Sequence, residues 1–169
     1  MSKSIEKMWA ENTDPTKSGK NGNMRFVGMS AFSYNTVVAV KYPDAPGTGG
    51  TGGTLVVADG GILNSRTTVK HKNKYVAAVP SSWKRVYVDM VDDYGDLCLL
   101  SPGLYLTTMR GLQLCHSLMA ERVKKLLENV YCAKAWKTYV LELDKLNKLG
   151  EFIGAPSVGL ESPPDVDAP

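Results

Sequence analysis

The sequence predicts an α+β fold: a small antiparallel sheet with a packed basic helix, followed by a long helical C-terminal element. Short segments with period-2 alternation recur before residue 106, and a helical run interrupts them after residue 65. Helical spacing then returns over residues 112–149. These three observations divide the chain into a small α+β domain at 1–106, a helical element at 107–150 and a tail at 151–169 that is expected to be disordered.

The N-terminal residues predict a short helix and a hairpin. The segment Ser2-Lys3-Ser4 precedes three apolar residues spaced as one helix face, which predicts a short helix with a hydroxyl cap. Residues 24–27 alternate as a strand that ends at Gly28, and a second strand is predicted over residues 32–40. The alternation in that second strand places four side chains on one buried face: Phe32, Tyr34, Val38 and Val40.

Two more strands are predicted, at residues 54–58 and 85–90. Between them, the basic segment 65–74 begins a helix that a proline ends near residue 80. We expect Thr67 or Thr68 to cap this helix, because the hydroxyls precede valines at helical spacing.

The helical pattern of residues 112–149 would run to about 57 Å as one straight helix, at about 1.5 Å per residue. That length exceeds the diameter of a globule of this size. The pattern therefore favours two packed helices with a break near residues 131–136 and a C-cap at Gly150. The alternative is one projecting helix that packs on a partner chain, and either form could support a homo-oligomer through the C-terminal helices.

The basic segment 65–74 carries the most candidate ligand contacts. It holds four cations, three hydroxyls and an imidazole, with no carboxylate. Free backbone N–H groups and the helix dipole attract anions at a helix N-terminus, so the expected ligand bears a phosphate. The candidate ligand-binding residues are Ser65, Thr67, Thr68, Lys70, His71, Lys72 and Lys74, together with Tyr34. The alternative is an ordinary capped helix with a solvated basic face.

Charge is divided unevenly along the chain. Residues 1–85 carry twelve Lys and Arg against five Asp and Glu, a net charge of +7, whereas residues 86–169 carry eight against twelve, a net charge of −4. A basic half attracts polyanions and speeds encounter with them. This asymmetry favours nucleic acid as the phosphate-bearing ligand.

Neither a cofactor nor a metal is predicted. Residues 47–52 match the G-x-G-x-x-G pattern, but they lead into a strand rather than a helix, so a loop is expected. The carboxylates between residues 89 and 96 match no EF-hand spacing, which favours a solvated turn. The three cysteines form no Cys-x-x-Cys pair, and the N-terminal ten residues hold no apolar run. We therefore expect no membrane partner and a reducing, cytoplasmic location.

His71 has a second interpretation. Its neighbours Lys70 and Lys72 disfavour the imidazolium, which leaves a neutral ring able to accept a proton near pH 7. A ribonuclease-like site needs a base, an acid and a cation on the phosphate. His71, Tyr34 and Lys70 could supply them if the fold brings Tyr34 to the basic segment, whereas His116 is expected to be a packed or surface residue.

Aromatic rings beside these cations are candidates for stacking nucleobases. They are Tyr34, Tyr42, Tyr75 and Trp83. Each of these rings could instead belong to the core.

Four motifs follow one another between residues 5 and 80: Trp9, then GNMRFVG at 22–28, then FSYNTVVA at 32–39, then Ser-x-Thr-Thr-x-Lys-His at 65–71. In order and spacing they resemble an uncharacterised small domain of bacteriophage and plasmid proteins. The resemblance implies a phage or mobile-element origin and action in the host cytoplasm, and it implies no activity. The glycine-rich loop at 47–53 and the helical C-terminal part depart from that pattern.

Together these observations predict a non-enzymatic, phage-type protein that binds a phosphate-bearing ligand, above all nucleic acid, through residues 65–74. No motif names a reaction. Three alternatives stay open: a protein that binds or sequesters a nucleotide signal, a metal-independent nuclease, and a structural or assembly subunit.

Overall fold

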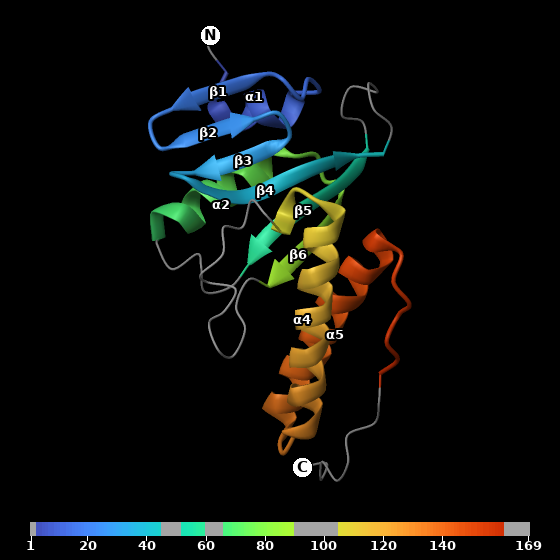
Figure 1. The fold of residues 1–169 in the computed structure, drawn as a ribbon. Coiled ribbons are helices and arrows are strands. Elements are labelled where there is room, and N and C mark those ends of the chain that lie inside the picture. Colours follow the sequence, from blue (N-terminus) through green and yellow to red (C-terminus); the bar gives the residue numbers. More distant parts are fainter. Residues whose placement is uncertain (1–2, 45–51, 60–65, 90–104, 161–169) are drawn as a thin grey trace.

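The computed structural model describes residues 3–44, 52–59, 66–89 and 105–160. One six-stranded sheet runs in the order β1-β2-β3-β4-β5-β6, with four described helices around it (Figure 1). The strands are β1 (Ser18–Asn21), β2 (Met24–Val27), β3 (Ser30–Ser33), β4 (Thr36–Pro43), β5 (Gly53–Asp59) and β6 (Lys84–Asp89). Neighbours from β1 to β5 are antiparallel, whereas β5 and β6 are parallel because α2 crosses between them. The predicted α+β class is confirmed.

Two N-terminal helices pack against each other over the sheet, α1 (Ile5–Glu11) and α2 (Arg66–Ala78). Trp9 of α1 is fully buried, and its indole Nε1–H donates to the carbonyl of Met29 at 2.9 Å. The Tyr75 ring of α2 meets the Trp9 ring edge to face, with 5.2 Å between ring centroids. The Tyr75 hydroxyl lies 2.8 Å from the carbonyl of Phe32, so the aromatic pair ties both helices to the sheet.

The predicted strand 32–40 is wrong as a single element, because the chain reverses within it. Ser33 ends β3 opposite Thr36 of β4, and Tyr34 and Asn35 form the two-residue turn between them. The expected shared face therefore does not form. Phe32 is half-exposed beneath the Arg25 guanidinium, which lies 4.0 Å from the ring centroid, while Ser33 is buried.

The reason for the error is that a two-residue turn preserves the apparent alternation of the sequence while moving the second half onto another strand. In β4 both faces are covered, so Val37 and Ala39 are buried as well as Val38 and Val40. The hairpin predicted around Gly28 does form, between β2 and β3, and Gly28 adopts a positive φ of 57° there.

Strands β5 and β6 match the predicted strands at 54–58 and 85–90. Residues 53–58 of β5 are all buried, as expected for a strand covered on both faces. The guanidinium of Arg85 in β6 donates to the carbonyls of Val76 and Val79 at 3.2 and 2.9 Å, which satisfies acceptors at the end of α2. Strand β1 was not predicted, because its residues are polar and do not alternate with apolar ones.

The C-terminal part is two packed helices, α4 (Met109–Glu128) and α5 (Ala133–Ile153), as the sequence favoured. Residues 129–132 form the non-helical connection between the two helices. Helix α5 continues past Gly150, which packs against the His116 ring, and ends at Gly154 with a left-handed φ of 80°.

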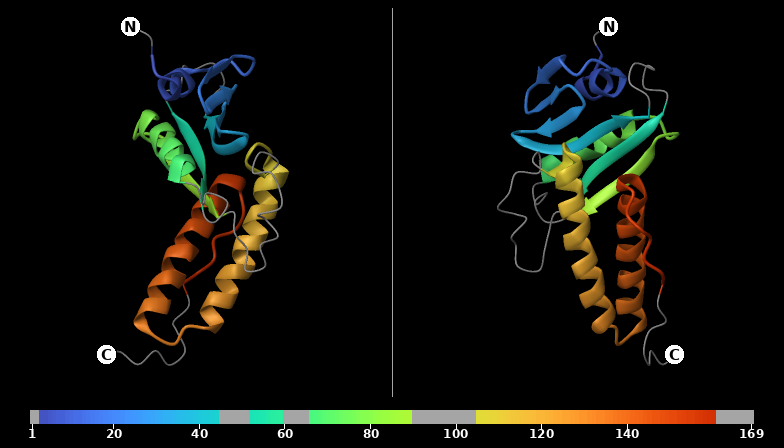
Figure 2. Two further views of the ribbon diagram at one scale, coloured as in Figure 1. Left: turned by 90° about the vertical axis from the view of Figure 1, so that its left-hand side faces the viewer. Right: turned by 45° about the vertical axis from the view of Figure 1, so that its right-hand side comes forward.

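This α4–α5 hairpin contacts β6 and projects away from the sheet, on the side opposite α2 (Figure 2). Residues 155–160 then run back beside α5, where the Asn147 side chain both donates to and accepts from the backbone of Val158. No helix within the described ranges combines the length and apolar character needed to cross a membrane.

Candidate functional site

The exposed side of α2 presents a row of cations. Arg66, Lys70 and Lys74 recur at a spacing of four residues and all three are exposed, so they share one helix face. Among the residues that the structure describes, none of the three forms an ion pair. We call these three side chains the α2 basic face.

Neither Thr67 nor Thr68 caps α2. The helix begins at Arg66, so Thr67 and Thr68 lie inside its first turn, and the expected cap at either threonine is wrong. Thr67 is exposed, whereas Thr68 is buried and its Oγ1 accepts a hydrogen bond from the Ser33 hydroxyl at 3.3 Å. The position that precedes the helix, Ser65, lies outside the described residues.

His71 is held against the sheet by the same buried hydroxyl. The Ser33 Oγ lies 2.7 Å from Nδ1 of His71, and Ser33 itself is fully buried at the end of β3. Burial, and to a lesser extent the charge of Lys74, lowers the pKa of His71. The imidazole is therefore fixed in orientation and favoured in its neutral form near pH 7.

Tyr34 stands beside this histidine. It has a φ of +55°, in the left-handed region that non-glycine residues rarely adopt, and its N–H donates to the Asn23 carbonyl at 2.7 Å. Its side chain is 47% exposed, and 6.1 Å separates its ring centroid from that of His71. The fold thus brings Tyr34 to His71 of the basic segment, 37 residues away along the chain.

Tyr34 is the exposed ring among the four candidates for stacking. Tyr75 and Trp83 are buried in the core. Tyr42 is half-buried against Phe152 of α5, and its hydroxyl donates to the Leu106 carbonyl. A base could therefore reach Tyr34 and none of the core rings.

Lys72 differs from the other lysines of the segment. Its Nζ lies 3.8 Å from Oδ1 of Asp59, at the end of β5, and its side chain is only 12% exposed. Lys145 of α5 approaches the other oxygen, Oδ2, at 3.1 Å. Asp59 thus links α2 to α5, and Lys72 contributes to the fold rather than to the exposed row of charge.

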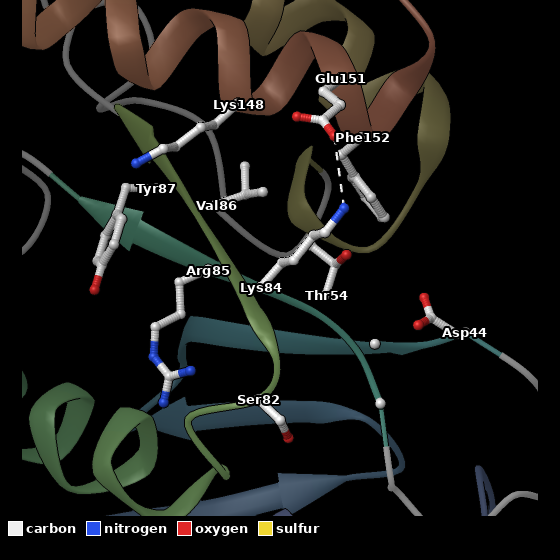
Figure 3. Close-up of a pocket in the computed structure, with 12 residues that line it drawn as sticks. Asp44, Thr54, Ser82, Lys84, Arg85, Val86, Tyr87, Lys148, Glu151 and Phe152 are labelled. Atoms are coloured by element: carbon white, nitrogen blue, oxygen red, sulfur yellow. Dashed lines mark ion pairs between the residues drawn. The ribbon is translucent and has the colours of Figure 1, made fainter.

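A cleft lies on the other side of the sheet, where the end of α5 meets β5 and β6 (Figure 3). Its volume is about 670 Å³. Lys84 and Glu151 form a 3.5 Å ion pair at its rim, and both side chains are about three-quarters exposed. Arg85 turns away toward α2, as Figure 3 shows. Sequence reasoning missed this cleft because its walls come from four separate segments of the chain. The ion pair at its rim joins opposite charges that are both exposed to solvent, so the cleft offers no concentrated charge to a ligand.

Comparison with protein-family models, curated proteins and solved structures finds no match for this chain. The resemblance to a bacteriophage and plasmid domain therefore stays a prediction.

Proposed function

We propose that this protein binds single-stranded nucleic acid through the α2 basic face, with Tyr34 as the ring on which a base stacks. The observation that carries the proposal is an exposed tyrosine beside His71, a residue of the helix that also carries three exposed cations. Proteins that hold single strands combine such cations, which follow the phosphates, with aromatic rings that accept any base.

The details of this surface support a strand rather than a compact nucleotide. Arg66 and Lys74 are eight residues apart, which corresponds to about 12 Å along a helix. That spacing suits successive phosphates better than one phosphate group. The cations stand on the exposed side of a helix, and the described residues near them supply one exposed ring rather than an enclosing wall.

The origin in a phage or plasmid rests on the resemblance alone, and the location in the host cytoplasm rests on the resemblance and on the cysteine pattern. We propose both on that basis. A homo-oligomer through the α4–α5 hairpin stays a prediction. Its support is that Leu114 and Leu141 are 47% and 64% exposed on the two helices.

A Tyr34→Gly variant tests the proposal without damaging the fold. Glycine adopts a positive φ without strain and keeps the N–H that donates to Asn23, so the free energy of unfolding should stay unchanged or rise by up to about 1 kcal/mol. Loss of the ring should weaken the binding of single-stranded RNA or DNA about 5- to 150-fold, because stacking contributes about 1–3 kcal/mol per base. Fluorescence anisotropy and denaturant unfolding measure the two effects.

The matched control is Tyr131→Ala, which removes an 84% exposed tyrosine from the far end of the α4–α5 hairpin. It should leave the affinity unchanged. If the parent, Tyr34→Gly and Tyr131→Ala proteins bind with equal affinity, Tyr34 is not part of the binding surface.

A further inference from the structure

His71 and Tyr34 form a pair in which one group is fixed and the other is held under strain. The Ser33 hydroxyl contacts Nδ1 of His71, so Nε2 is the ring nitrogen left to meet a ligand. When Ser33 donates its single hydrogen to Thr68, across the 3.3 Å contact between the two hydroxyls, Nδ1–H can donate to Ser33. In that tautomer Nε2 carries the lone pair that a general base requires.

The backbone of Tyr34 holds a conformation that costs about 1–3 kcal/mol for residues other than glycine. Such strain persists where the surroundings fix it, and here the hydrogen bond to Asn23 and the β3–β4 pairing do so. The consequence is a phenol placed beside the imidazole, with 6.1 Å between the ring centroids. Because the two rings adjoin and neither is fully buried, one phosphodiester can contact the imidazole and the phenol at the same time.

Cations complete the arrangement. Lys70 and Lys74 are exposed on either side of His71 along α2, one residue before it and three residues after it. Positive charge beside a phosphate stabilises the negative charge that develops on its oxygens in the transition state. A base, an acid and two cations therefore meet on one patch of described residues.

We infer that this patch cleaves single-stranded RNA by internal transesterification, with His71 and Tyr34 as the acid–base pair. The inference rests on the proposed binding function. His71 Nε2 takes the proton of a ribose 2′-hydroxyl, and the 2′-oxygen forms a bond to the adjacent phosphorus. The bond from phosphorus to the 5′-oxygen breaks, and the Tyr34 hydroxyl protonates that leaving oxygen. The products are a 2′,3′-cyclic phosphate and a 5′-hydroxyl, and proton exchange with water restores both side chains.

The chemistry sets the substrate class. The nucleophile belongs to the substrate itself, so DNA, which lacks the 2′-hydroxyl, should bind without being cleaved. A base stacked on Tyr34 would place a neighbouring phosphate close to His71, because the two rings adjoin. Duplex RNA should be a poor substrate, since its bases are already stacked on one another and cannot reach the ring.

The experiment uses the full-length protein and an end-labelled, randomised single-stranded RNA pool, with the matched DNA pool, in the presence of a chelator. Four proteins are compared: the parent, His71→Gln, Tyr34→Phe and the control Tyr131→Phe. Cleavage products and affinity are measured on the same samples. We expect the parent and the control to produce 2′,3′-cyclic phosphate ends, whereas the two site variants cleave about 100-fold or more slowly and bind within about threefold of the parent.

The possible failures are distinct. RNA that is bound and left intact overturns the cleavage inference and leaves the proposed function in place. Absence of binding to either pool overturns the proposed function, and this inference with it. Cleavage that persists undiminished in both site variants belongs to a contaminating ribonuclease, and cleavage of DNA at a similar rate excludes the 2′-hydroxyl as nucleophile. Either result overturns the inference.

Discussion

Replacing Trp9 by alanine should lower the free energy of unfolding by about 3–5 kcal/mol, the cost of removing a large, fully buried aromatic side chain. The cavity would open where α1, α2 and the sheet meet. Tyr75 would lose its edge-to-face partner, and the Met29 carbonyl would lose the indole donor. Lys41 would also lose a neighbour, because its Nζ lies 5.5 Å from the centroid of the indole ring. That Nζ donates to the carbonyls of Ala10 and Asn12.

Denaturant unfolding of three proteins measures this effect. Trp9→Phe, which keeps a ring but not the indole N–H, should fall between the parent and Trp9→Ala. Tyr131→Ala, at the exposed end of the hairpin, should change the free energy of unfolding by no more than about 0.5 kcal/mol. A loss below about 1 kcal/mol in Trp9→Ala would mean that α1 does not dock on the sheet as described.

The second large effect concerns binding. A combined Arg66→Ala, Lys70→Ala, Lys74→Ala variant should bind single-stranded nucleic acid more weakly than the parent. The slope of log affinity against log salt should also become shallower by about 2 units. Each phosphate contact on a single strand contributes about 0.7 to that slope through the release of condensed counterions. Titrations at several salt concentrations give both quantities.

A matched variant separates the α2 basic face from net charge. Lys124→Ala, Lys134→Ala, Lys137→Ala removes the same charge from exposed positions on the α4–α5 hairpin, and it should leave the salt slope close to that of the parent. Lys72 is unsuitable for either set, because it is paired with Asp59. A loss carried by one lysine alone, with a shallow salt dependence, would indicate a compact nucleotide instead of a strand.

The sequence predicted well the elements whose periodic pattern extends over many residues, because an error of a few residues at either end does not hide such a pattern. Helical spacing identified α2 and the C-terminal helices, and the length of about 57 Å for a single helix favoured the break that separates α4 from α5. The position of β5 followed from an apolar run bounded by turn residues, and that of β6 followed from period-2 alternation. Their parallel pairing depends on the crossover through α2, which local patterns do not report.

The reversal at Tyr34 could not be predicted, because neither Tyr34 nor Asn35 is a glycine and the alternation continues through them. The position of the turn depends on tertiary contacts: the backbone bond to Asn23 and the burial of Ser33 beneath α2. The candidate site likewise combines a feature visible in the local sequence with contacts that only the fold creates. The basic segment was identified from composition, but the Ser33 contact to His71 and the pairing of Lys72 with Asp59 join residues more than ten positions apart.

Photocrosslinking tests the central claim most directly. Single-stranded RNA carrying 4-thiouridine is irradiated with the full-length protein, and the crosslinked peptides are identified by mass spectrometry. Crosslinks should fall on the peptides that contain Tyr34 and α2, and they should diminish in Tyr34→Gly. Crosslinks confined to the α4–α5 hairpin, or to the cleft beside Lys84 and Glu151, would contradict the assignment of nucleic-acid binding to the α2 basic face.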